Sequence, residues 1–178
     1  CDAARLMRTC KNLYACVSRA RIMDAETFIS CPLSVWRKHF PGARAANVGG
    51  DPDEWEARLD LTDADFVHFR GLHTLDMTWC GQITITDAAF AHLEGIHTLD
   101  MSYCSQAGIT SAAFARLKGI HTLNMKYCWQ AGITDAAFVH LKGIHTLNMS
   151  MCNQEGITDA AFEHLAGIHA LDMSWCNQ

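Results

Sequence analysis

The chain has 178 residues, of which 49% are hydrophobic, and a formal net charge of −5. The charge is uneven: residues 1–45 carry eight Lys and Arg against three Asp and Glu, whereas residues 46–178 carry six against sixteen. No apolar run approaches the roughly 18 residues of a membrane span, and the acidic second part excludes a phosphate-binding surface there. We therefore expect neither a membrane nor a nucleic acid as partner.

Residues 1–20 are predicted to form an amphipathic helix. Leu6, Leu13 and Val17 follow the three- and four-residue spacing of one helix face. One interpretation is a capping helix that shields the first repeat from solvent.

The same stretch also resembles the second half of an F-box. In residues 2–14 an aspartate opens a leucine-rich helix, and Cys10 and Lys11 lead to the aromatic Tyr14. The resemblance implies binding to a ubiquitin-ligase adaptor through the N-terminal region. The leading Leu-Pro segment and first helices of that family do not occur in this sequence.

A second helix is predicted over residues 25–40, after a short strand at residues 21–23. Pro32 lacks the amide hydrogen that a helix interior needs, so the helix should break there. We assign residues 1–42 to a small helical N-terminal region.

Residues 43–51 read as a degenerate copy of the strand that recurs later in the chain. Ala43, Ala46 and Val48 take its apolar places, and Asp51 takes the place of a cysteine. An acidic insertion over residues 51–56 follows, and residues 61–66 restore the pattern. The array is therefore expected to span residues 43–178. We expect both ends to be cuts from a longer chain, because the first residue is not Met and the last lies inside a repeat phrase.

From residue 72 onward the chain is a tandem repeat with a period of 24 residues. In the unit that starts at Ile96, Leu99 and Met101 alternate with polar residues, which predicts a half-buried strand. The helix that follows should begin after Thr110 as N-cap and end at Gly119. A further set of residues forms its inward face: Ile109, Ala113, Phe114, Leu117 and Ile120. A unit this short cannot bury its apolar side alone, so neighbouring units must stack.

The spacing from Ile96 through Leu99 and Met101 to Cys104 resembles the leucine-rich-repeat signature of the cysteine-containing type. This resemblance covers about residues 43–178 and implies a right-handed α/β solenoid, with parallel strands on a concave face and short helices on a convex face. It also implies function by protein–protein recognition.

Partner contacts are expected on the concave face, where polar strand residues lie beside a stripe of large side chains that can serve as binding hot spots. The alternative is that the rings pack on one another; the two are compatible. Trp129 breaks the local repeat. The predicted contact residues are Asp76, Thr78, Trp79, Asp100, Ser102, Tyr103, Asn124, Lys126, Tyr127, Trp129, Asn148, Ser150, Met151, Asp172, Ser174 and Trp175.

Histidines recur before each strand and within the helices, but rings stacked at strand spacing do not converge on one tetrahedral metal centre. We expect each ring before a strand to hydrogen-bond backbone between units, and its protonation near pH 6 to loosen the column. The positions before the strands are His73, His97, His121, His145 and His169.

Five of the nine cysteines occupy one repeat position, which predicts a buried structural thiol that bonds a carbonyl of the adjacent unit. A catalytic cysteine needs one activated site, so no enzyme, metal or cofactor is expected. The glutamines at 82, 106, 130 and 154 are expected to form a related amide ladder. Reduced thiols favour an intracellular protein, cytoplasmic or nuclear.

These features predict a protein-interaction module, in particular the substrate-recognition part of an F-box-type ubiquitin ligase. The alternative is a structural or assembly scaffold, cellular or viral, without a ligase role.

Overall fold

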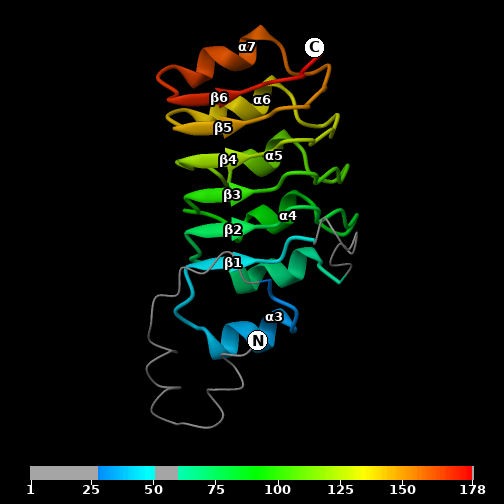
Figure 1. Ribbon diagram of the computed structural model, residues 1–178, viewed down its shortest axis with the longest axis vertical. Helices are drawn as coiled ribbons and strands as arrows, with labels where there is room; N and C mark the ends of the chain where they lie inside the picture. The colour runs from blue at the N-terminus through cyan, green and yellow to red at the C-terminus, as the bar shows by residue number, and fades with distance from the viewer. Residues whose placement is uncertain (1–27, 51–59, 178) are drawn as a thin grey trace.

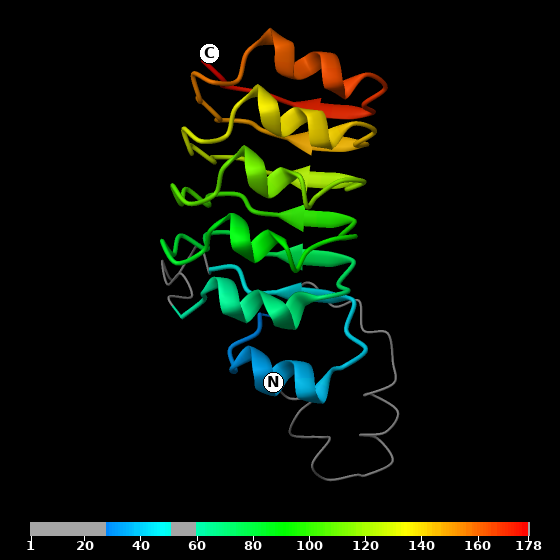
Figure 2. The same ribbon diagram turned by 180° about the vertical axis from the view of Figure 1, so that it is seen from behind.

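The computed structural model describes residues 28–50 and 60–177. Six short strands form one parallel sheet in chain order, with every neighbouring pair in register. The sheet lies on one face of the stack and the helices on the other, as opposite views show (Figures 1 and 2). The strands are β1 (Ala45–Asn47), β2 (Thr74–Asp76), β3 (Thr98–Asp100), β4 (Thr122–Asn124), β5 (Thr146–Asn148) and β6 (Ala170–Asp172).

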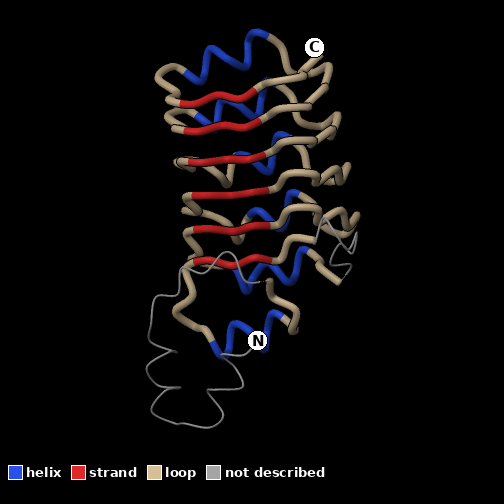
Figure 3. Tube along the Cα trace, viewed as in Figure 1, coloured by secondary structure: helices blue, strands red, loops and turns tan. Residues whose placement is uncertain are grey.

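Each strand from β1 to β5 is followed by a short helical segment, so that strand and helix together make one coil of the array (Figure 3). The helical elements are α3 (Leu33–His39), η1 (Asp63–Phe69), α4 (Asp87–Phe90), α5 (Ser111–Phe114), α6 (Asp135–Phe138), η2 (Val139–Leu141), α7 (Asp159–Phe162) and η3 (Glu163–Leu165). No described helix is long and apolar enough to cross a membrane.

The interior is built from the columns that the repeat pattern predicts. Leu99 and Met101 are at most 1% exposed, and Phe114 is fully buried. Because all such residues join one continuous core that extends through the coils, each coil supplies part of its neighbour's interior.

The degenerate first strand is confirmed with its predicted alignment. Ala46 of β1 pairs with Leu75 of β2, and both are buried. Small residues suffice here because α3 closes this end of the interior with Leu33 and Trp36.

The helix predicted over residues 25–40 is shorter than expected. Phe28 forms a parallel bridge with Asn47, and the Ile29 amide donates to the Asn47 carbonyl at 2.9 Å, so this segment adds to the sheet edge. The helix begins only after Pro32, whose missing N–H is harmless at a helix start. The predictions for residues 1–23, including the F-box-like stretch, and for residues 51–56 lie outside the described residues.

The repeat helices are also shorter than predicted. Thr110 caps α5 by accepting a hydrogen bond from the Ala112 amide at 3.2 Å, as expected, but the helix ends at Phe114 rather than near Gly119. Turns then close through the Leu117 and Ile120 amides, each bonding a carbonyl three residues earlier. These tighter turns advance further per residue than an α-helix and bring the chain back to the sheet within 24 residues.

Neighbouring helices are joined by a ladder of side-chain hydrogen bonds. The Asp87 carboxylate accepts from both the amide and the hydroxyl of Thr110 in the next coil, each at 2.7 Å. Ser111 stands in the aspartate's place one coil later, and its hydroxyl accepts from the Thr134 amide at 2.9 Å. The N-cap of each of these helices is therefore held by the preceding coil.

Candidate functional site

The sheet face carries three side-chain columns that we name here. The carboxylate–amide column is Asp76, Asp100, Asn124, Asn148 and Asp172. The hydroxyl column is Thr78, Ser102, Lys126, Ser150 and Ser174, with Lys126 as its exception. The rim column is Trp79, Tyr103, Tyr127, Met151 and Trp175. With Trp129 they comprise all sixteen predicted contact residues.

The first two columns hold each other in place. Asp100 Oδ1 accepts from the amide of Ser102 at 2.9 Å and from its hydroxyl at 2.6 Å, and most other coils repeat this arrangement. Ser102 and Ser150 are each only 4% exposed. These two serines thus shape the face and offer a partner almost no surface.

The rim column adopts a backbone conformation that favours glycine. All five residues have φ between 57° and 62°, because each is the third residue of a tight turn, closed in the β3 coil by the Cys104 amide and the Met101 carbonyl at 3.2 Å. This left-handed conformation costs an L-residue roughly 1–2 kcal/mol. Five bulky residues at such a position indicate that the side chains themselves have a role.

Part of that role is stacking. The Trp79 and Tyr103 rings lie 4.1 Å apart at an interplanar angle of 8°, and Tyr103 and Tyr127 lie 4.6 Å apart at 17°. Packing of the rings on one another, one of the two expected roles, is therefore present in this half of the column. Trp175 differs, because it is 73% exposed.

Trp129 stands beside the rim column with 58% of its surface exposed. Its indole Nε1 donates to the Met151 carbonyl at 2.7 Å, and its ring lies 5.8 Å from that of Tyr127 at an interplanar angle of 58°. The hydrogen bond fixes the orientation of an exposed indole, which is typical of an interface anchor.

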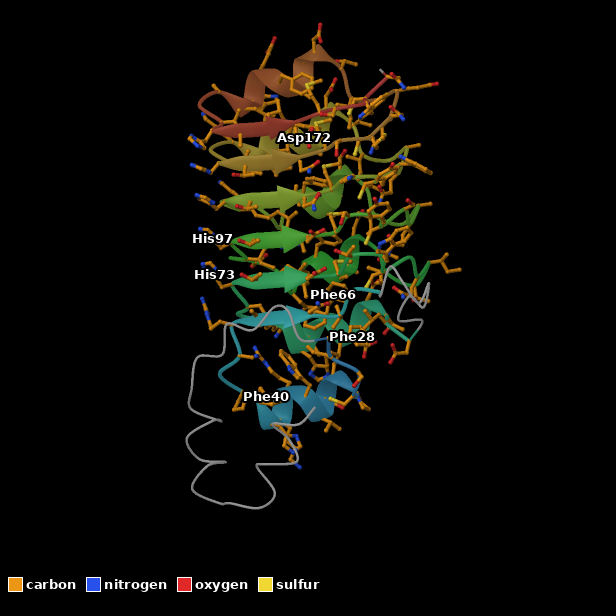
Figure 4. The ribbon with its side chains drawn as sticks, viewed as in Figure 1. Phe28, Phe40, Phe66, His73, His97 and Asp172 are labelled. Atoms are coloured by element: carbon orange, nitrogen blue, oxygen red, sulfur yellow. The ribbon has the colours of Figure 1, made fainter. Side chains whose placement is uncertain are left out.

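The histidines that precede the strands stack along the edge where the strands begin, as His73 and His97 show in Figure 4. Centroid distances between successive rings are 4.3 to 4.5 Å. Rings of the first four lie 3.1 to 3.4 Å from the hydroxyl of the adjacent threonine. The prediction that they bond backbone between coils was wrong, since the backbone amides and carbonyls of these histidines already pair between coils.

The stack affects protonation. Desolvation, and then the neighbouring His121 and His169, lower the pKa of His145 below its ordinary value of 6.5. A charged imidazole is disfavoured in the folded array because its neighbours would share the charge's sign.

The cysteine column is structural, as predicted. Cys104 Sγ donates to the Met77 carbonyl of the preceding coil at 3.1 Å, and Cys128 and Cys152 repeat the contact. Burial raises the pKa of the Cys104 thiol well above its ordinary value and that of Cys152 to about 12, so these thiols stay protonated at neutral pH. A protonated, buried thiol is unsuited to nucleophilic attack.

Three of the glutamines play a role related to that of the cysteines, as predicted, but their side-chain amides bond backbone carbonyls rather than one another. Gln130 Nε2 donates to the Cys104 carbonyl at 2.6 Å and Gln154 Nε2 to the Cys128 carbonyl at 2.7 Å, and Gln106 makes the same bond to Cys80. The backbone carbonyl is the acceptor in each case because it points toward the next coil's side chain. These three amides therefore tie a coil to its predecessor, whereas the buried Gln82 side chain makes no such bond.

The last coil is hollowed at its end. An open cavity of about 500 Å³ lies at the last coil, lined by apolar residues such as Ile157 and Phe162 and by polar ones such as Glu155 and Asp159. In the described part of the chain no group of His, Cys, Asp or Glu side chains is arranged to hold a metal ion.

No protein-family model and no curated protein matches the sequence. Among solved structures, the chain is similar to Rad7 from yeast in complex with Elc1, with a TM-score of 0.60 and 17% identity over 95% of this chain and 47% of that one. It is also similar to TLR13 in complex with ssRNA13, with a TM-score of 0.54 and 17% identity over 78% of this chain and 19% of that one.

At these identities the likeness establishes the fold alone. Together with the single parallel sheet and the short helices that alternate with its strands, it identifies an α/β leucine-rich-repeat solenoid. The chain spans less than half the length of each of these two neighbours.

Sequence reasoning named the columns but missed the left-handed turn of the rim column. Aromatic side chains give no local signal for positive φ. The spacing of this column, always one residue before the cysteine that closes the turn, is the feature from which the turn could have been inferred.

Proposed function

We propose that this chain is a protein-interaction module that binds its partner through the sheet face and its rim. The observation that supports this most directly is the rim column, where bulky residues occupy five left-handed positions and Trp175 and the neighbouring Trp129 remain exposed. Unfavourable backbone conformations are retained where the side chain has a use, and exposed aromatic residues dominate binding energy at interfaces.

The test compares the full chain with rim variants. Wild type, Trp129→Ser and Trp175→Ser would be biotinylated and used to capture proteins from lysate, with Val139→Ser on the helix side as the control. Val139 is also exposed, at 51%, so its replacement matches the loss of apolar surface. Partners that are lost from both rim variants and kept by the control support the proposal. Equal capture by all four proteins contradicts it.

A finer proposal is that the module selects substrates for an F-box-type ubiquitin ligase inside the cell. Two observations favour it: the F-box resemblance of residues 2–14, and the likeness to Rad7, whose solved complex contains Elc1. Co-purification of this chain with a ubiquitin-ligase adaptor, lost when Leu6 and Leu13 are replaced by Asp, supports the ligase role. A scaffold without a ligase role predicts no adaptor binding while the rim-dependent partners remain.

A further inference from the structure

We propose that the middle of the sheet face recognises an acidic segment of a protein partner, with Lys126 binding a carboxylate and Trp129 an adjacent apolar side chain. This inference rests on the proposed function and names the chemistry of its partner.

The charge pattern of the sheet face changes at its centre. The array is acidic as a whole, with six Lys and Arg against sixteen Asp and Glu over residues 46–178. In the carboxylate–amide column, however, β4 and β5 carry Asn124 and Asn148, which lie side by side in the paired strands. The same coil as β4 places Lys126 in a column that is otherwise Ser or Thr. Two negative charges are thus replaced by neutral amides where a positive charge is added.

The Lys126 ammonium group is available to bind a partner's carboxylate. Among the residues that the structure describes, Arg116 forms an ion pair with Glu94. Lys126 has no carboxylate partner among these residues. Asp100, the carboxylate of the coil that precedes Lys126, accepts a hydrogen bond from the Asn124 side-chain amide at 2.8 Å. Lys126 Nζ lies 5.6 Å from the centre of the Tyr127 ring, which supports the ammonium group through a cation–π contact.

The charge of Lys126 acts beyond its own coil. The pKa of Asp172 lies below its ordinary value, mainly because the Ser174 side chain and amide donate hydrogen bonds to it and to a smaller degree because of Lys126. An anion at the Lys126 coil would meet this positive charge, whereas one at Asp76, Asp100 or Asp172 would meet a carboxylate.

Trp129 supplies the apolar part of the same site. Both it and Lys126 depart from the repeat, and both lie within 6 Å of the Tyr127 ring, at 5.8 and 5.6 Å. Other coils have Gly81, Ser105, Asn153 or Asn177 where this coil has the indole. Because its Nε1 is already bonded to Met151, the ring loses little freedom when a partner packs on its exposed face.

The two groups together define what fits. A basic segment would meet Lys126 with like charge, and a purely apolar one would leave its ammonium group unpaired. In an extended segment, side chains two residues apart are roughly 7 Å apart on one face. An Asp or Glu placed two residues from an aromatic or large aliphatic residue can therefore reach Lys126 and Trp129 at once.

The test uses a phage library of random 12-residue peptides selected on the immobilised full chain. We expect enrichment of Asp or Glu two residues from Phe, Trp or Leu. Enriched peptides, made synthetically, should bind Lys126→Ser and Trp129→Ser at least tenfold more weakly than wild type. Both changes install a serine that a neighbouring coil carries at the same position, so the fold is kept.

Two controls define the specificity. Lys142→Ser removes an exposed lysine outside the sheet face and should leave affinity unchanged. Replacing the peptide's carboxylate residue by its amide should weaken binding to wild type by about the same factor as Lys126→Ser, with no further loss when the two changes are combined.

Enriched peptides without an acidic residue, or with full affinity for Lys126→Ser, would overturn the inference. The proposed function would still stand if those peptides were lost on Tyr103→Ala or Trp175→Ser. If the wild-type chain enriches no peptide at all, both proposals are contradicted.

Discussion

The interior and the sheet face of the same coils follow opposite rules. From β2 to β5 the interior repeats the same leucine and methionine in every coil, each at most 1% exposed. In the rim column the residue is Trp, Tyr or Met, depending on the coil. Lys126 in the hydroxyl column and Trp129 beside the rim column each occur in one coil only. Strand register is unchanged across these substitutions, so it does not depend on which residues occupy the outer columns. The outer columns are therefore free to differ where a partner requires it.

The largest expected effect comes from opening the interior. Phe138→Ala removes a fully buried ring that packs against Phe162 of the next coil, with 6.2 Å between the two ring centroids. Such a change should lower the free energy of unfolding by about 3–5 kcal/mol, from lost burial and the cavity left behind. Urea unfolding followed by circular dichroism measures it. Val139→Ala, next in sequence but exposed, should cost less than about 0.5 kcal/mol, and similar losses for the two variants would refute the distinction.

Substitutions in the hydrogen-bond ladder between neighbouring helices should change the free energy of unfolding by a smaller amount. One variant should gain stability and another should lose it. Ser111→Asp places a carboxylate where the other coils have one, so the Thr134 amide and hydroxyl gain a charged acceptor. We expect a gain of about 0.5–1 kcal/mol, and a comparable loss for Asp87→Ser. Thermal unfolding at pH 7 checks both. Destabilisation by Ser111→Asp would mean that the ladder does not link the coils as described.

The stacked histidines should make stability depend on mild acid. Since the pKa of His145 is lowered in the folded array from 6.5, the unfolded chain takes up the proton first. The stability that the neutral His145 side chain contributes is complete above pH 6.5 and is lost as the pH falls below that value. We expect a lower melting temperature at pH 5.5 than at pH 7.5, and a smaller difference for His145→Asn. His140→Asn, outside the stack, is the control; an unchanged melting temperature in wild type would contradict the role of the stack.

A pair of variants at Tyr103 tests the left-handed backbone of the rim column. Tyr103→Ala loses two ring stacks and keeps the left-handed backbone, so it should destabilise by about 1–2 kcal/mol. Tyr103→Gly loses the same stacks but relieves the strain, and should therefore lie within about 1 kcal/mol of wild type. The difference between the two variants in chemical denaturation gives the free-energy cost of the left-handed backbone. If alanine proved no worse than glycine, the rim conformation would carry no measurable strain.

Sequence reasoning reached the architecture because the interior is periodic. The alternation around Leu99 and the cap at Thr110 follow from local rules, and even Ala46 was aligned correctly because the apolar spacing survives in the first strand. The early end of the helices at positions such as Phe114 was missed, because closure of the coil rather than helix propensity sets their length.

The candidate site was harder to predict for a different reason. Its residues were named, but its electrostatics depend on pairing between coils. That Asn124 lies beside Asn148, and that Asn124 engages Asp100 and leaves Lys126 without a carboxylate, requires the register and side-chain contacts of the folded array. Stacking of the histidines similarly depends on side-chain directions that a period alone does not specify.

Three of the side-chain columns that join the coils share one direction. Thr110 donates back to Asp87, Cys104 to Met77 and Gln130 to Cys104, each to the preceding coil. If one whole period such as residues 97–120 were excised, the donors of the next coil would meet equivalent acceptors in the coil before the deletion; Gln130, for example, would meet Cys80 in place of Cys104. The length of this protein can therefore change by duplication or loss of a gene segment without redesign of any junction, which leaves reach and valency open to rapid evolutionary adjustment.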